Sequence, residues 1–258
     1  MKTIAAFLLV LCHLAISHAW NCKAGPRLSY ASQIDAGQGK VVATDRYNRN
    51  YFLSGSSWYR LPSASLKHVT VGHAGMWGIS TRNYIYKFVA GSWARASGSL
   101  KQIDAGGNLF TVGVTTSNYP YCLRTSYVLG FHGKGSVSWT RMSTRLKYYS
   151  CGPYGCWGVD TSSRVYLTKS VTPSSCANSG WVQIPGLALN VVEVGSDGKV
   201  FGVTTTGQVC ERTGITSRVP QGTVWTFVPI CTPMKHVSYD LGNVWAVSTS
   251  GVVMRCTH

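Results

Sequence analysis

Residues 181–212 read WVQIPGLALNVVEVGSDGKVFGVTTTGQVCER, and the same pattern returns along the chain. A tryptophan opens it, and an apolar run ending in glycine follows. A large–small–apolar triplet comes next, here Phe201, Gly202 and Val203, and a residue such as Cys210 stands nine positions after its start. A fragment of one copy, QIDAG, is written twice, at residues 33–37 and 102–106. Recurrence at this spacing indicates a repeated structural unit.

Six copies cover residues 20–258. The opening tryptophans lie 38, 35, 46, 42 and 44 residues apart, and we take the copies to begin near residues 20, 58, 93, 139, 181 and 225. The middle residue of the triplet is always small; these residues are Ala43, Gly78, Gly113, Gly158, Gly202 and Ala246. The register holds at three positions in each copy, so the repeat is a property of the whole segment.

Each copy consists of short segments typical of β-strands, such as KHVTV, WGIS and NYIYKF, separated by polar turns. A period near 40 residues with about four short strands is typical of a β-propeller. The sequence therefore predicts an all-β, six-bladed propeller as one domain over residues 20–258. We expect the small middle residue to allow close approach of the inner strands near the axis. Asp35 and Asp104 of the two QIDAG segments are expected to act as turn residues.

The first 19 residues resemble a secretory signal peptide, with Lys2 before an apolar run and small residues at Ser17 and Ala19. We therefore expect a secreted, extracellular protein whose mature chain begins at Trp20, with no membrane span. Eight cysteines remain in that chain, and in a secreted protein they predict four disulfides.

Eight cysteines allow 105 pairings, so the connectivity stays open. A terminal bridge would fasten the last blade to the first, the closely spaced pair in CGPYGC would form a local loop, and proximity suggests the other two. The expected pairs are Cys22–Cys256, Cys151–Cys156, Cys122–Cys176 and Cys210–Cys231. No second cysteine or histidine pair with ligand spacing follows CGPYGC, so a zinc site is not expected.

The charge of the chain is strongly positive, with 24 Lys and Arg against 8 Asp and Glu. The basic residues are spread along the sequence, which favours a broadly positive surface. Such a surface attracts anionic partners, among them acidic polysaccharide, glycolipid phosphate, nucleic acid and anionic membranes. The same charge also serves solubility alone, and the sequence favours neither interpretation.

The unit at residues 181–212 resembles a tectonin repeat. Six such repeats behind a signal peptide, with eight cysteines, are similar to the fish egg lectins. The resemblance covers the whole mature chain and implies a six-bladed propeller that binds N-acetylglucosamine and related glycans. It also implies recognition of bacterial surface glycans such as lipopolysaccharide, in eggs and in innate defence. Two departures are visible: Val42 replaces an aromatic residue in the first copy, and the third copy carries an insertion around residues 131–138.

Two sets of recurring loops offer candidate sugar contacts, because function in such folds tends to reside on loops. Loops between the strand entry and the central strand offer His73, Asn108, Tyr154, Asp197, Asp240 and Asn243. The opposite turns offer Asp45, Tyr47, Asn48, Asn83, Tyr84 and Tyr119. For each residue alone the alternative is an ordinary solvated turn. Several sites on one rigid ring would engage a repetitive glycan surface together.

An enzyme is not expected. The chain has no Gly-x-Ser-x-Gly or His-Glu-x-x-His motif, and Ser196 and Asp197 are adjacent where a sialidase box needs a spacer. No cofactor is indicated, although scattered loop acids could hold calcium weakly without an EF-hand loop. The alternative function is charge-driven binding of acidic polysaccharide or other polyanions. Nucleic acid is not expected as a partner, because only residues 141–149 approach a basic stripe with aromatics.

Overall fold

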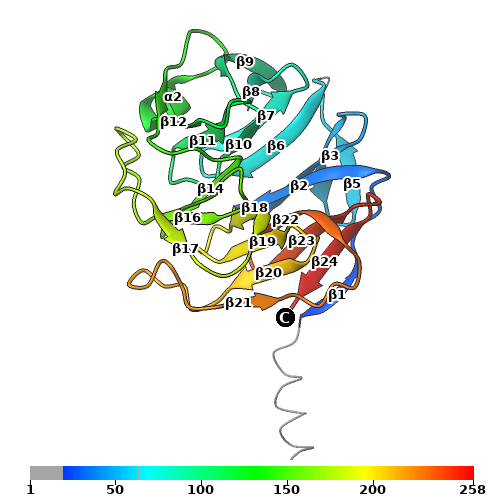
Figure 1. Cartoon of the computed structure of the whole chain (residues 1–258). Coiled ribbons are helices and arrows are strands. Elements are labelled where there is room, and N and C mark those ends of the chain that lie inside the picture. Colours follow the sequence, from blue (N-terminus) through cyan, green and yellow to red (C-terminus); the bar gives the residue numbers. More distant parts are fainter. Residues whose placement is uncertain (1–19, 63) are drawn as a thin grey trace, which may run out of the picture.

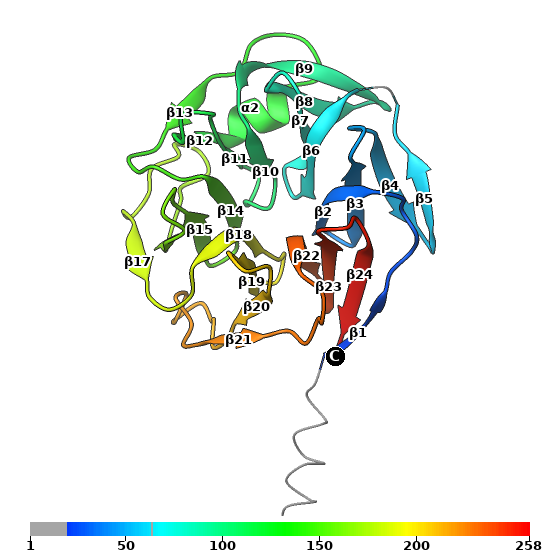
Figure 2. The same cartoon turned by 45° about the vertical axis from the view of Figure 1, so that its right-hand side comes forward.

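The computed structural model describes residues 20–62 and 64–258, so the expected signal peptide lies outside the described residues. The strands form six four-stranded antiparallel sheets around a central axis, which confirms the all-β, six-bladed prediction (Figures 1 and 2). Within the described residues, no helix is long and apolar enough to cross a membrane.

Each blade has an innermost strand along the axis and three strands outside it. The innermost strands are β2 (Ala31–Gly37), β6 (Leu66–Gly72), β10 (Gln102–Asp104), β14 (Tyr148–Gly152), β18 (Leu189–Val194) and β22 (Met234–Asp240). The second strands are β3 (Lys40–Asp45), β7 (Gly75–Ser80), β11 (Thr111–Val114), β15 (Gly155–Val159), β19 (Val200–Thr204) and β23 (Asn243–Ser248).

The outer half of each blade is built in the same order. The third strands are β4 (Asn50–Ser54), β8 (Tyr84–Val89), β12 (Pro120–Leu123), β16 (Val165–Thr168), β20 (Val209–Arg212) and β24 (Val253–Thr257). The outermost strands are β5 (Ser57–Arg60), β9 (Ser92–Ser99), β13 (Trp139–Arg141), β17 (Val182–Ile184), β21 (Trp225–Phe227) and β1 (Asn21–Ala24). A short helix, α2 (Thr125–Gly130), lies between β12 and β13, beside the expected insertion.

The sheets are offset by one strand from the sequence repeats. Trp58 and Trp93 open copies of the repeat, but they lie in the outermost strands β5 and β9 of the blade before. The chain accordingly begins with the outermost strand of the last blade, because β1 pairs with β24 (Figure 2). The Cys22–Cys256 disulfide joins two directly paired positions of these strands and closes the ring.

Three of the expected disulfides are present and one expected pairing is wrong. The bridges are Cys22–Cys256, Cys122–Cys176 and Cys151–Cys156. Cys210 and Cys231 are not joined: Cys210 is buried in β20, with its Sγ 3.6 Å from the carbonyl oxygen of Gly202, whereas Cys231 is exposed. In the β20–β21 ladder Cys210 lies opposite Phe227, so Cys231 comes only after β21 has ended.

The close approach at the axis uses other glycines than expected. A Cβ on Gly72, the last residue of β6, would overlap the carbonyl oxygen of Ala105 in the next blade. The middle glycine of the triplet instead makes room within its own blade, since a Cβ on Gly78 would lie 2.6 Å from Cδ1 of Leu66. The large residue before that glycine packs between blades: Trp157 meets Trp225 edge-to-face at 6.1 Å.

Candidate functional site

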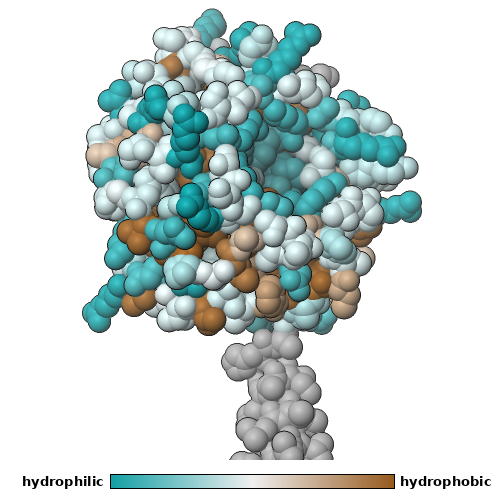
Figure 3. Space-filling model, in the orientation of Figure 1, coloured by the Kyte–Doolittle hydropathy of each residue, from teal (hydrophilic) through white to brown (hydrophobic). Residues whose placement is uncertain are grey.

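The propeller has two open ends, which are distinguished by the direction of the innermost strands. At the exit end these strands finish and turn into the second strands; those turns include residues 72–75, 104–111 and 240–243. At the entry end the innermost strands begin, beside turns such as 45–50, 80–84 and 115–120. A strongly hydrophilic hollow opens on the face shown in Figure 3, over the inner strands β2 and β6.

A cleft of about 500 Å³ opens at the exit end between the third and fourth blades. It brings together two of the predicted residues, His73 and Asn108, and both side chains are exposed. The buried Phe110 and the exposed Lys169 and Ser170 also line it. The cleft therefore combines an apolar ring with an amide, an imidazole and a hydroxyl, which suits a ligand with one apolar face and several hydroxyls.

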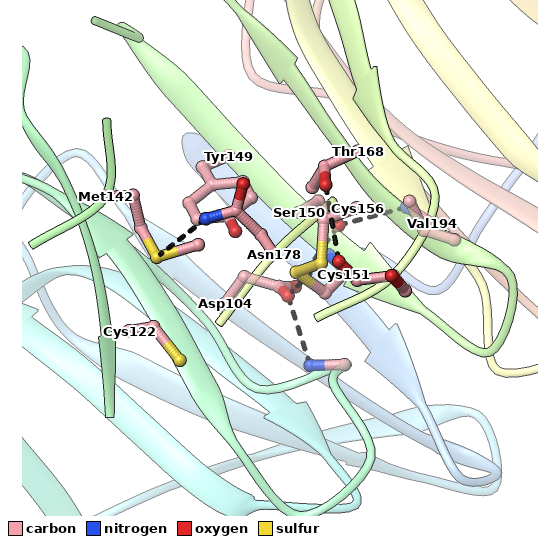
Figure 4. Close-up of a disulfide and its surroundings, with 12 residues drawn as sticks. Asp104, Cys122, Met142, Tyr149, Ser150, Cys151, Cys156, Thr168, Asn178 and Val194 are labelled. Atoms are coloured by element: carbon pink, nitrogen blue, oxygen red, sulfur yellow. Dashed lines mark hydrogen bonds between the residues drawn. A yellow bond between two sulfur atoms is a disulfide. The ribbon is translucent and has the colours of Figure 1, made fainter. Parts of the chain in front are cut away.

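One wall of this cleft is held by the Cys151–Cys156 disulfide, which closes the turn between β14 and β15 (Figure 4). The Asp104 carboxylate lies beside it and accepts hydrogen bonds from the backbone N–H of Cys151 at 2.9 Å and of Gly106 at 3.2 Å. Ser150 donates its hydroxyl hydrogen to the other Asp104 oxygen at 3.3 Å. The third and fourth blades are thus tied together directly beneath the cleft.

Two predicted residues of the exit end have packing roles. Tyr154 is half-buried and its ring fills the space beside Gly198, where a Cβ would overlap it. Asp197 accepts hydrogen bonds from the N–H of Lys199 at 3.0 Å and from the Tyr239 hydroxyl at 3.0 Å. Neither residue lines the 500 Å³ cleft.

A second exit-end cleft, of about 290 Å³, lies at the corresponding place between the sixth and first blades. It contains the predicted Asp240 and Asn243, together with Trp245 and Arg255. Asp240 is buried and accepts a hydrogen bond from Gly39 N–H at 2.6 Å, and Asn243 Oδ1 accepts one from Arg255 Nε at 2.8 Å. These bonds fix polar groups beside the aromatic ring of Trp245.

At the entry end, Asp45 and the predicted asparagines hold turns together. Asp45 is buried, accepts hydrogen bonds from the N–H groups of Tyr47 and Arg49, and forms an ion pair with Arg49 at 2.6 Å. Asn48 and Asn83 have φ values of 61° and 65°, a left-handed conformation that asparagine tolerates. Their positions are therefore explained by turn geometry.

The predicted tyrosines of the entry end are partnered by arginines. The guanidinium of Arg95 lies 3.7 Å from the ring centre of Tyr84, and that of Arg141 lies 3.8 Å from that of Tyr119. Tyr47 remains 52% exposed and borders a cleft of about 260 Å³. Arg46 and Arg49 also lie 4.8 and 4.9 Å from the ring centre of Tyr47, but that ring is exposed whereas Tyr84 and Tyr119 are half-buried, so Tyr47 is the predicted tyrosine with most ring surface available.

Alternating carboxylates and hydroxyls surround the axis, one from each innermost strand. They are Asp35, Thr70, Asp104, Ser150, Glu193 and Ser238. The expectation that Asp35 and Asp104 serve turns is wrong for Asp35, whose Oδ2 accepts the N–H of Val71, in the next blade, at 2.7 Å. Asp104 has both roles, because it accepts the N–H of Gly106 in its own turn and that of Cys151 in the next blade. Burial raises the pKa of Asp35 to about 6 and, with help from the Asp35 charge, that of Asp104 to about 8.

Sequence reasoning missed the residues that complete the clefts from strands or from the next blade. Phe110 and Lys169 line the larger cleft, and Trp245 and Arg255 line the smaller one. The only sequence signal for them is their place in the repeat, next to the loops that were singled out. Among the residues described, no group of three or more His, Cys, Asp or Glu is arranged to hold a metal ion.

The fold and its repeated clefts define a six-bladed β-propeller built from one repeated unit. The Tectonin domain model matches residues 30–249, and the chain belongs to this family.

Two relatives align over long stretches. The chain is 40% identical over 157 residues to the fish-egg lectin of Cyprinus carpio, a match that covers 60% of this chain and 65% of that lectin, just under two thirds of its length. It is 27% identical over 225 residues to the perivitellin-2 31 kDa subunit of Pomacea maculata, covering 85% and 67%.

Among solved structures, a gluconolactonase of Xanthomonas campestris superposes with a TM-score of 0.65. The sequence identity is 11%, over 92% of this chain and 89% of that one. This likeness extends to the propeller fold alone.

Proposed function

We propose that this protein is a secreted, multivalent lectin that binds N-acetylglucosamine-type glycans and bacterial surface glycans such as lipopolysaccharide, in eggs or in innate defence. The observation that carries the proposal is the pair of clefts at equivalent positions between blades of the exit end. Each combines polar side chains with a large aromatic residue, Phe110 in one and Trp245 in the other. The name of the Cyprinus carpio relative points the same way.

The larger cleft has the dimensions of a small-ligand site, since such sites measure roughly 300–1,000 Å³. Asn108 offers an amide that both donates and accepts, so it would bond a sugar hydroxyl or an N-acetyl group, and His73 would bond a neighbouring hydroxyl. The two clefts lie on opposite sides of a rigid ring, three blades apart. Simultaneous binding to one glycan surface would raise avidity by roughly 10²- to 10⁴-fold. Binding in this proposal involves no reaction and no cofactor.

Calorimetric titration of residues 20–258 with N-acetylglucosamine oligomers, at low and at high salt, tests the proposal. We expect heat that is insensitive to salt, with a stoichiometry of two. Asn108→Ala should remove the stronger component and leave the other cleft active, because its amide is exposed and lines only the larger cleft. Asn21→Ala, an exposed asparagine on the outermost strand β1, is the matched control.

The second candidate function is charge-driven binding of acidic polysaccharide or other polyanions. It is favoured by the excess of 24 basic over 8 acidic residues. The same titration separates the two functions. If no sugar oligomer gives heat, while heparin or lipopolysaccharide binds in a salt-sensitive manner, charge carries the function and the exit clefts are not sugar sites.

A further inference from the structure

Four lysines occupy one repeat position at the entry end of the axis. They are Lys67, Lys101, Lys147 and Lys235, and we call them the lysine ring. Each lysine stands one residue before a buried side chain of its innermost strand. Lys67 precedes His68, and Lys235 precedes His236. The other two copies have Ser32 and Asn190 at this position. All four lysines are half-buried.

The local backbone explains why these side chains share one placement. In β6 and β22 the ladder register shifts between the residues that flank Lys67 and Lys235, so each lysine is the extra residue of a β-bulge. Lys101 and Lys147 occupy the corresponding place, and their N–H groups bond to Val114 and Val159 of their own blades at 2.7 Å. A bulge redirects the side chain of its extra residue, and it does so for Lys67 and Lys235.

The ammonium groups are held by neutral partners. Lys67 Nζ donates to Asn83 Oδ1 at 2.6 Å, and Lys101 Nζ donates in the same way to Asn118. Lys147 Nζ donates to Ser163 Oγ at 2.7 Å and to the amide oxygen of Asn190, at the next ring position, at 3.0 Å. These bonds orient the lysines without neutralising them, so the positive charge of the ring remains available.

The acids of this end are already engaged by arginines. Asp45 is paired with Arg49 and Asp160 with Arg164, at 2.6 and 2.7 Å. Desolvation lowers the pKa of all four lysines, and the charges of Lys147 and Lys67 lower the pKa of Lys101 further, so both lie within electrostatic reach of Lys101. The charge of Asp160 acts in the opposite direction on the pKa of Lys147. A bound anion would relieve this repulsion.

We propose that the lysine ring is a binding site for a phosphate group, either free phosphate or a phosphomonoester carried by a sugar. A group that is nearly doubly charged and has three acceptor oxygens suits several ammonium donors placed at one end of the propeller. The site is at the opposite end of the propeller from the exit clefts. It therefore stands whether or not those clefts bind sugars.

The charge-reduced variant Lys101→Gln/Lys147→Gln tests the site in the mature chain. Glutamine removes the charge, keeps a polar N–H donor and is one atom shorter than lysine. The probes are inorganic phosphate and glucosamine 6-phosphate, titrated calorimetrically at low salt. We expect both to bind the unaltered protein, and the variant to bind them roughly tenfold more weakly or worse. Heat from N-acetylglucosamine oligomers should be unchanged.

The matched control is Lys23→Gln/Lys134→Gln, which removes the same charge from exposed lysines in β1 and in the loop before β13. Equal weakening in both double variants would overturn the site, since only overall charge would then matter. Absence of phosphate binding by the unaltered protein would also overturn it. Tighter binding of glucosamine 6-phosphate than of inorganic phosphate would identify a phosphorylated sugar as the ligand, and equal binding would identify free phosphate. If the double variant does not fold, the single variant Lys235→Gln replaces it. It should weaken the binding of both probes, to a smaller degree.

Discussion

Cys22 in β1 and Cys256 in β24 stand directly opposite each other in adjacent antiparallel strands, and a disulfide joins them across 234 residues of sequence. β1 has only four residues and is the outermost strand of its blade, so its ladder alone is a weak closure. The covalent bond removes freedom from nearly the whole unfolded chain. Ring closure therefore depends on this pair more than on any contact of β1.

Removing the terminal disulfide should destabilise the propeller far more than removing the local one. Cys22→Ser/Cys256→Ser opens the long loop and should cost about 5 kcal/mol of unfolding free energy in the chain-entropy model. Cys151→Ser/Cys156→Ser opens a loop with a separation of 5 residues and should cost about 2 kcal/mol. Denaturant unfolding of both variants measures the difference. Equal losses would contradict the closure argument, as would terminal peptides that separate without reduction in a digest.

Gly72 should tolerate no side chain, because a Cβ there overlaps the carbonyl oxygen of Ala105 in the next blade. The overlapping atom belongs to the backbone directly after the innermost strand β10, so relief requires the blades to move apart. Gly72→Ala should lower the unfolding free energy by roughly 2–4 kcal/mol. Gly130→Ala, where a Cβ meets nothing within 4 Å, is the control and should be close to neutral in thermal unfolding. A neutral Gly72→Ala would show that the inner strands are more loosely packed than the structure indicates.

The two unpaired cysteines should differ sharply in reactivity. Cys231 is exposed, whereas Cys210 is buried and burial raises the pKa of its thiol to about 12. Because the thiolate is the reacting species, a maleimide should label one thiol in folded protein of residues 20–258 and a second only after unfolding. Cys231→Ser should abolish native labelling. Two unreactive thiols in the unfolded, unreduced chain would restore the Cys210–Cys231 pairing that the structure contradicts.

The fold was predictable because the repeat registers at three positions in each of six copies, and about four short strands in each copy favour a ring of similar blades. The position of the blade boundary was not predictable in the same way. A periodic sequence does not show at which strand of a blade the ring begins. That position is decided by the pairing of β1 with β24, at the far end of the chain. The same geometry places Trp58 on the blade before its own repeat.

Loop reasoning located part of the candidate site and none of the contacts between blades. His73 and Asn108 came from recurring turns, and the structure brings them to one cleft. A repeated polar residue at a strand end, such as Asp35, predicts a turn contact, but its partner Val71 lies 36 residues away, in the next copy. A polar side chain repeated at alternate positions of the innermost strands, as in Gln33 and Asp35, was the available signal. Gln33 bonds both to the N–H and to the carbonyl of Val69 in that next blade.

The buried carboxylates of the axis should make the protein less stable as pH rises, and Asp35 offers the clearest test. Burial raises its pKa from 3.8 to about 6, so between those values the folded chain keeps a proton that the unfolded chain has lost. Folding stability tied to Asp35 is therefore greatest below about pH 4 and declines by roughly 3 kcal/mol up to about pH 6. Asp35→Asn, which resembles the neutral acid, should remove that part of the decline in urea unfolding measured from pH 4 to 7. Asp197→Asn, an exposed carboxylate outside the axis, should leave the slope of the unaltered protein in place. If Asp35→Asn and the unaltered protein show the same slope, Asp35 is ionised in both states and its burial is compensated by the N–H of Val71 and the hydroxyl of Ser238.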